Sequence, residues 1–171
     1  YTDMACGPKY FTYINQELPT LCRRFFGIQP VPERTYIMGL SMGGYGAMKC
    51  AFTAPQQYAG CAGFSSVAEI QAELPQLCRW HEDQAIFPHG IVPPQDNLFD
   101  LVEKFRDRTC SMPRLFLACG QQDSLYPANL RLRDTLQAMN WPLTWYEAPG
   151  DHNWFFWNDA LGRAMKELLE N

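Results

Sequence analysis

The chain has 171 residues, of which 47% are hydrophobic and 19% charged, and its formal net charge is −4. This length and composition suit one globular domain with a buried core and exclude a disordered chain. The negative charge argues against nucleic acid or an anionic membrane as a partner, and no apolar run reaches the roughly 20 residues that span a bilayer.

The first part of the chain predicts a helix, a buried strand and a second helix. Helical spacing of apolar residues covers 8–26, where Pro19 kinks or restarts the helix before a glycine and two prolines end it. Residues 34–40 are short and apolar with a β-branched member, which predicts a buried strand. A helix over 42–53 follows at once, so the chain turns sharply at Ser41.

The same alternation continues to the end of the chain. Further strands are predicted at 58–65, 114–119 and 143–147. Further helices are predicted at 67–79, 98–107, 127–139 and 154–169. Alternating strands and helices imply right-handed crossovers, so the fold class is α/β, with a parallel sheet flanked by helices. We expect one domain over 1–171, with a lid-like insertion over the loosely patterned 66–112.

One short motif carries chemistry. Gly39-Leu40-Ser41-Met42-Gly43 matches G-x-S-x-G, in which a serine stands on a sharp strand-to-helix turn. We expect strained backbone at Ser41 and glycines on both sides because larger side chains would collide there. The Met42 N–H, at the start of the helix, would then serve an oxyanion hole. The alternative is a glycine-rich turn in which Ser41 merely caps the helix.

A serine hydroxyl needs a base, and the base needs a carboxylate to hold its tautomer. His152 follows the last predicted strand, whereas His81 and His89 lie in polar or irregular segments and are expected at the surface. Asp123 follows the strand over 114–119, at the sheet edge where sites of parallel sheets assemble. Asp151 is the rival acid, and Asp123 could instead form a turn. The order Ser41, Asp123, His152 is that of α/β-hydrolases.

No metal or organic cofactor is expected for this chemistry. His81, Glu82, Asp83 and His89 form an alternative metal cluster, but their spacing matches no known ligand pattern. The seven cysteines lack C-x-x-C spacing, which indicates small buried core residues with free thiols. Their odd number favours a reducing compartment, so we expect a cytoplasmic protein.

Five short segments resemble one known family. They are Tyr1-Thr2-Asp3 with Glu17-Leu18-Pro19, the stretch from Gly39 to Ala47, Cys119 to Tyr126, and Gly150 to Trp157. Together they are similar to the Putative esterase family of α/β-hydrolases, tributyrin-esterase-like members above all, which also contains esterase D (S-formylglutathione hydrolase), feruloyl esterases and mycolyltransferases. The resemblance implies Ser41 as nucleophile, Asp123 as acid and His152 as base.

The resemblance also implies which reaction the protein catalyses and which parts of the fold are missing from this chain. It points to a serine carboxylesterase that hydrolyses short-chain or carbohydrate-linked acetyl or feruloyl esters through an acyl-enzyme. Because the chain begins at Tyr1, the first strands of the fold and the second oxyanion donor are expected to be missing. Two alternatives stay open: an acyltransferase on the same residues, or a truncated, non-catalytic fragment. Association into homo-oligomers is a further expectation.

Aromatic residues suggest where a substrate would lie. Trp154 and Phe155 come shortly after His152, and Trp154 is expected to bind substrate. Phe87 and Phe99, in the insertion, are further candidates for an acyl pocket. All four could equally be core residues, which is the commoner role of aromatic side chains at helical spacing.

Overall fold

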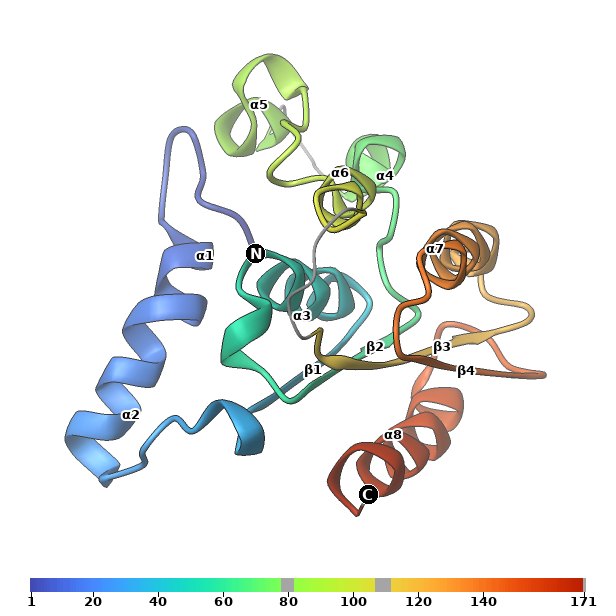
Figure 1. Cartoon of the computed structure of the whole chain (residues 1–171). Coiled ribbons are helices and arrows are strands. Elements are labelled where there is room, and N and C mark those ends of the chain that lie inside the picture. The colour runs from blue at the N-terminus through green and yellow to red at the C-terminus, as the bar shows by residue number, and fades with distance from the viewer. Residues whose placement is uncertain (78–81, 107–111, 171) are drawn as a thin grey trace.

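The computed structural model describes residues 1–77, 82–106 and 112–170, which fold around a parallel sheet (Figure 1). Its strands are β1 (Tyr36–Leu40), β2 (Gly60–Phe64), β3 (Arg114–Gly120) and β4 (Leu143–Ala148). They lie side by side in chain order, and every neighbouring pair is parallel. All four carboxyl ends therefore meet at one edge of the sheet.

Helices cover both faces of this sheet. The helices that enclose its two apolar layers are α3 (Met42–Thr53), α6 (Leu98–Glu103), α7 (Tyr126–Ala138) and α8 (Trp154–Leu169). Further helices in the insertion are α4 (Ile70–Leu77), α5 (Glu82–Ile86) and the 3-10 turn η4 (Pro88–Gly90). The remaining elements are α1 (Tyr10–Thr12), the π turn η1 (Tyr13–Glu17), α2 (Leu18–Phe26) and the 3-10 turns η2 (Pro32–Arg34) and η3 (Pro55–Gln57).

Alternating strand residues divide the apolar interior into two layers. Cys61, Leu115 and Leu117 point to the face covered by α3, α6 and α7. Ala62 and Phe116 point to the opposite face, where they pack against α8. Figure 1 shows the two layers, with α3 above the sheet and α8 below it. The two central strands, β2 and β3, are buried on both faces and are mainly apolar for that reason, whereas the outer strands β1 and β4 are half-buried.

The insertion has a small core of its own. Leu74, Phe87 and Val92 form a separate buried cluster. In contrast, α6 packs into the main core, and Asp96 just before it forms a buried ion pair with Lys49 of α3. The second half of the insertion is therefore an integral part of the domain, and a lid-like role for the rest stays a prediction.

Most predicted elements are confirmed with shifted ends. The strand predicted from 34 starts at Tyr36 because η2 comes first, and the helix predicted over 67–79 starts at Ile70. Pro19 restarts the helix, one of its two expected effects: η1 ends at Glu17, and Pro19 lies in the first turn of α2, where a missing N–H is tolerated. The patterns missed α5, which is too short to show a periodicity. Among the described residues, none of the helices is long and apolar enough to cross a membrane.

Candidate active site

Ser41 lies where β1 meets α3, at the carboxyl edge of the sheet. Its φ of 54° and ψ of −121° are strained for a residue with a side chain. Backbone hydrogen bonds hold this conformation: Ser41 N–H donates to the Phe64 carbonyl at 2.8 Å, and Val67 N–H donates to the Ser41 carbonyl at 3.2 Å. The strand end and the following loop thus present the Ser41 hydroxyl outward.

The glycines of the motif have different reasons to be glycine. A Cβ on Gly39 would overlap the carbonyl of Gly43, and one on Gly44 would overlap the Ser66 hydroxyl. A Cβ on Gly43 would meet nothing within 4 Å. We predicted that glycines on both sides of Ser41 avoid collisions. This prediction is wrong for Gly43, because a side chain at that position of the helix would point into open space.

The imidazole of His152 bridges Ser41 and Asp123. Its Nε2 lies 2.9 Å from Ser41 Oγ, and its Nδ1 lies 2.9 Å from Asp123 Oδ2. The Asp123 side chain is fully buried, whereas that of His152 is 33% exposed. The other oxygen of Asp123 accepts a hydrogen bond from Leu125 N–H at 2.9 Å, which fixes the carboxylate. The structure therefore brings together Ser41, Asp123 and His152, the three side chains that we predicted from the sequence at separate strand ends.

Asp151 does not reach the imidazole. Its Oδ1 accepts a hydrogen bond from the backbone N–H of His152 at 2.7 Å, and its side chain belongs to an exposed turn. Asp123 occupies the place beside Nδ1 because a neighbour in sequence cannot fold back onto the ring while it holds the turn.

Two interlocked turns place His152 beside Asp123, and sequence reasoning missed the residues responsible. Gln122 N–H donates to the Gly150 carbonyl at 2.9 Å, and Gly150 N–H donates to Gln122 Oε1 at 2.6 Å. A Cβ on Gly120 would overlap the Gly150 carbonyl, so this close approach requires glycine. No spacing rule could have found these residues because the turns lie far apart in the chain.

Backbone donors stand beside Ser41. Met42 is the first residue of α3, and the first helical hydrogen bond is donated by Gly44 to the Ser41 carbonyl at 3.0 Å. The Met42 N–H comes before this first bond, so it has no acceptor within the helix. It lies at the positive end of the helix, where an anion is stabilised.

The aromatic candidates separate into surface and core. Trp154 is 66% and Phe155 93% exposed, and the Trp154 ring packs edge-on against Trp157 with centroids 5.6 Å apart. Phe87 is 1% exposed within the small core of the insertion, and Phe99 packs against the main core. Phe87 and Phe99 are thus core residues, as the alternative interpretation held.

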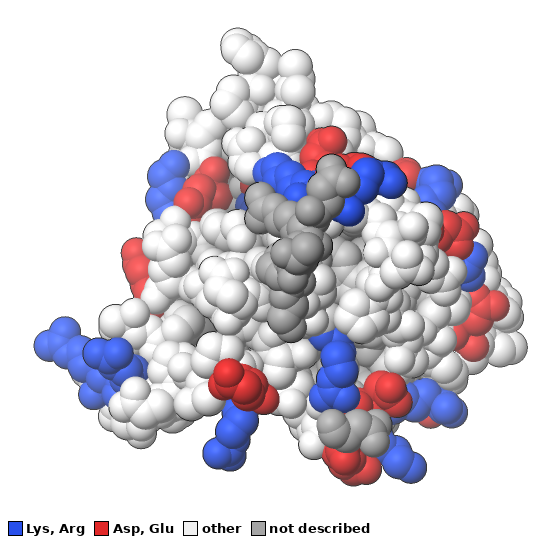
Figure 2. Space-filling view, viewed as in Figure 1, with Lys and Arg blue, Asp and Glu red and all other residues white. Residues whose placement is uncertain are grey.

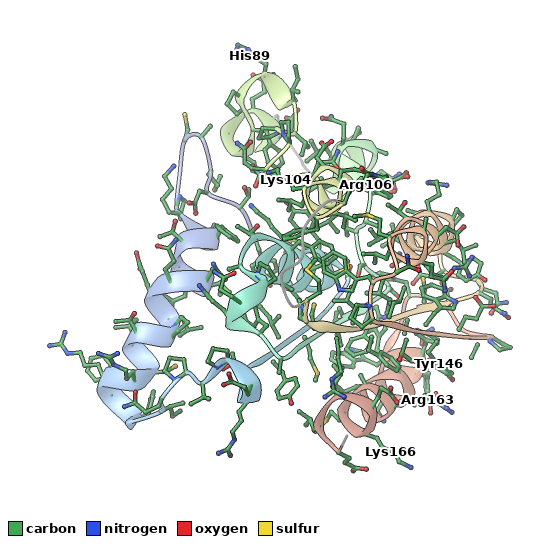
Figure 3. All side chains as sticks on the ribbon, in the orientation of Figure 1. His89, Lys104, Arg106, Tyr146, Arg163 and Lys166 are labelled. Atoms are coloured by element: carbon green, nitrogen blue, oxygen red, sulfur yellow. The ribbon has the colours of Figure 1, made fainter. Side chains whose placement is uncertain are left out.

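The remaining candidates for a metal site gain no support. His89 is exposed and projects beyond α5, away from the sheet (Figure 3). His81 lies outside the described residues. Within 1–77, 82–106 and 112–170, no group of three or more His, Cys, Asp and Glu side chains could hold a metal ion.

The cysteines are only partly the core residues that were expected. Cys50, Cys61 and Cys119 are buried free thiols, and burial raises the pKa of Cys50 to about 11 and that of Cys119 to about 12. The prediction is wrong for Cys6, which is exposed, and Cys22 is half-buried. Cys78 and Cys110 lie outside the described residues. The buried thiols stay protonated near neutral pH and offer no thiolate nucleophile.

Surface charge is mixed on the face that Figure 2 shows, where Lys and Arg lie beside Asp and Glu at several places. Among the ion pairs at the surface, Arg106 pairs with Glu103.

A strained serine between strand and helix, an acid after β3 and a histidine after β4, on a parallel sheet, define an α/β-hydrolase fold. The sequence profile described as Putative esterase matches residues 2–168, and the chain belongs to that family. An acetyl esterase of Caldicellulosiruptor saccharolyticus is 28% identical over 97% of the chain, which spans 66% of that relative's length. The chain thus covers slightly less than two thirds of this relative.

Solved structures agree with this assignment. A fluorophosphonate-binding serine hydrolase F of Staphylococcus aureus superposes with a TM-score of 0.89 at 30% identity, covering 100% of this chain and 68% of its own. An S-formylglutathione hydrolase from Staphylococcus aureus superposes with a TM-score of 0.77 at 29% identity, covering 93% of this chain and 60% of its own.

Proposed function

We propose that Ser41, His152 and Asp123 form the catalytic triad of a serine carboxylesterase. The observation that carries the proposal is the bridging imidazole, with 2.9 Å at each of its nitrogens. These contacts join three loops that are distant in sequence, and the order of the residues matches that of α/β-hydrolases. The similarity to an acetyl esterase and to a fluorophosphonate-binding serine hydrolase supports the same chemistry.

The reaction follows from the hydrogen bonds. His152 Nε2 takes the Ser41 proton as Oγ attacks the ester carbonyl, and then gives that proton to the leaving alcohol. Asp123 accepts from Nδ1–H, which holds the tautomer and stabilises the imidazolium. Water, activated by the same Nε2, then attacks the acyl-enzyme and releases the acid.

The Met42 N–H would donate to the oxyanion of each tetrahedral intermediate. It stands next to Ser41 at the start of α3, where the helix dipole adds to its effect. One such donor is worth about 3 kcal/mol of transition-state stabilisation in hydrolases of this kind.

The substrate class proposed is a small ester, with acetyl and other short acyl groups first. This choice rests on the similarity to the acetyl esterase. Trp154 is the proposed contact for the substrate. Its exposed ring packs against Trp157, and Trp157 in turn packs against His152. An exposed indole suits the apolar face of a sugar or an alkyl ester.

The test compares Ser41→Ala with Ser124→Ala, an exposed serine that takes no part in the triad's hydrogen bonds. With p-nitrophenyl acetate, we expect Ser41→Ala to lower kcat by at least about 10⁴-fold and Ser124→Ala to leave it unchanged. A fluorophosphonate probe should label the parent and Ser124→Ala but not Ser41→Ala. Equal hydrolysis by Ser41→Ala would refute the proposal.

Two further outcomes address the alternatives. If the parent neither hydrolyses the ester nor reacts with the probe, the chain is a non-catalytic fragment and the proposal fails. If an added alcohol receives the acyl group in preference to water, the protein is an acyltransferase on the same triad.

A further inference from the structure

A buried tryptophan packs against the ring of His152. Trp157 lies in the first turns of α8 and is 8% exposed, and its ring meets the imidazole edge-on, with centroids 4.8 Å apart and planes at 85°. The indole N–H donates a hydrogen bond to Ser65 Oγ at 3.0 Å. His152 is thereby connected, through one aromatic ring, to the residue that follows β2.

Ser65 is a rigid anchor for this contact. It is fully buried and has a φ of 45°, a conformation that side-chain-bearing residues rarely adopt. Its N–H donates to the Ala118 carbonyl of β3 at 2.7 Å. The side chain of Asn129 holds both backbone groups of the next residue, Ser66, at 2.8 and 3.2 Å. Strained backbone that is held this firmly points to a functional role.

Ser65 also meets a neutral partner. Cys119 Sγ lies 4.0 Å from its hydroxyl, and burial raises the pKa of this thiol to about 12. Near neutral pH the thiol stays protonated and places no negative charge beside the indole.

The histidine needs a support of this kind. The N–H and the lone pair that bind Asp123 and Ser41 lie in the plane of the ring, so these two hydrogen bonds oppose small tilts of the imidazole out of that plane only weakly. The His152 side chain is 33% exposed, so protein does not enclose it. The edge-on indole is a third contact, and it opposes such tilts.

We propose that Trp157 and Ser65 are positioning residues for the triad: the Ser65 hydroxyl fixes the indole of Trp157, and the indole fixes the plane of the His152 ring. This inference rests on the proposed function, since the alignment matters for proton transfer between Ser41 and His152. It predicts that the hydrogen bond acts on the chemical step and not on substrate binding, because Trp157→Phe keeps an aromatic ring for Trp154 to pack against.

Two variants remove the hydrogen bond from opposite ends. Trp157→Phe keeps an aromatic ring but loses the N–H, and Ser65→Ala loses the acceptor. We expect each to lower kcat for p-nitrophenyl acetate about tenfold with KM unchanged, because small misalignments of reacting groups are costly. Since both act through one bond, the double variant should be no slower than the slower single variant.

Trp141→Phe is the matched control. Trp141 is 7% exposed, and its indole N–H donates to the Pro113 carbonyl at 3.0 Å, beside the amino ends of β3 and β4. This variant loses a buried indole hydrogen bond of the same kind at the opposite edge of the sheet. We expect it to unfold at a lower urea concentration, as Trp157→Phe does, but to keep its kcat.

A second readout does not depend on turnover. The proton on His152 Nδ1 that is shared with Asp123 gives a far-downfield ¹H NMR signal while the ring stays aligned. We expect this signal in the parent and in Trp141→Phe, and expect it broadened or lost in Trp157→Phe and Ser65→Ala. An unchanged signal and kcat in both variants, or additive losses in the double variant, would overturn the inference. A parent without the signal would overturn the triad itself, whereas a parent with the signal but without hydrolysis would refute the esterase alone.

Discussion

Two aspartates stand close to the same histidine, and their surroundings give them different tasks. Asp123 is buried and meets the imidazole Nδ1, while Asp151 is exposed and meets the backbone N–H of His152. Water cannot take over the hydrogen bond that a buried carboxylate accepts, whereas it can take over one that an exposed carboxylate accepts in a turn. The proposed chemistry therefore depends on the first carboxylate and not on the second.

Asparagine substitutions separate these two tasks. In Asp123→Asn, the amide can present a donor to Nδ1 and favour the wrong tautomer, so we expect kcat to fall by about 10⁴-fold. In Asp151→Asn, the amide oxygen still accepts the His152 N–H, so we expect less than a twofold change. Steady-state hydrolysis of p-nitrophenyl acetate, with circular dichroism to confirm folding, measures both. A larger loss for Asp151→Asn would reverse the assignment of the acid.

At the scale of elements, the two glycines of the G-x-S-x-G motif do not contribute equally to the turn around Ser41: Gly39 is required and Gly43 is not. A Cβ at Gly39 would collide with the Gly43 carbonyl, whereas one at Gly43 has open space. We expect Gly39→Ala to destabilise the protein by about 1–3 kcal/mol, as overpacking does. Gly43→Ala should be neutral or slightly stabilising, because alanine favours a helix. Urea unfolding of the two variants tests this, and equal destabilisation would contradict it.

The elements that carry the triad could be predicted because each has a local signal. The strands β1, β3 and β4 are rich in apolar residues; Ser41 follows β1 directly, and Asp123 and His152 lie in the turns after β3 and β4. The supports of the triad have no such signal. Gln122 is bound to Gly150 and Ser65 to Trp157 across long stretches of chain, and a sequence pattern does not record contacts of that kind. The small helix α5 was missed because its five residues are too few to show a periodicity.

At the scale of the whole molecule, a buried ion pair and the helix α6 join the second half of the insertion to the main core. Lys49 of α3 and Asp96 are both nearly inaccessible to water, and Tyr45 of α3 donates from its hydroxyl to the Asp96 carbonyl at 2.7 Å. Removing one partner of such a pair typically costs 3–5 kcal/mol because the other charge stays buried. The helix that begins beside Ser41 is thereby fixed to the second half of the insertion.

The first half of the insertion has a small core of its own. We expect it to open separately from the main core, together with the turn at Ala5 and Cys6, whose N–H groups donate to the Ile86 and Ala85 carbonyls. Phe87 is buried there with Leu74 and Val92, while Phe52 is buried in the main core. We expect Phe87→Ala to speed amide hydrogen exchange in α4 and α5 and to leave the main unfolding transition in place. Phe52→Ala removes a ring from the main core and should lower global stability by about 3–5 kcal/mol. If the first half also covers the triad as a lid, Phe87→Ala will change kcat/KM for bulky esters more than for acetate esters. Equal effects of the two variants on global unfolding would show that the two cores melt as one.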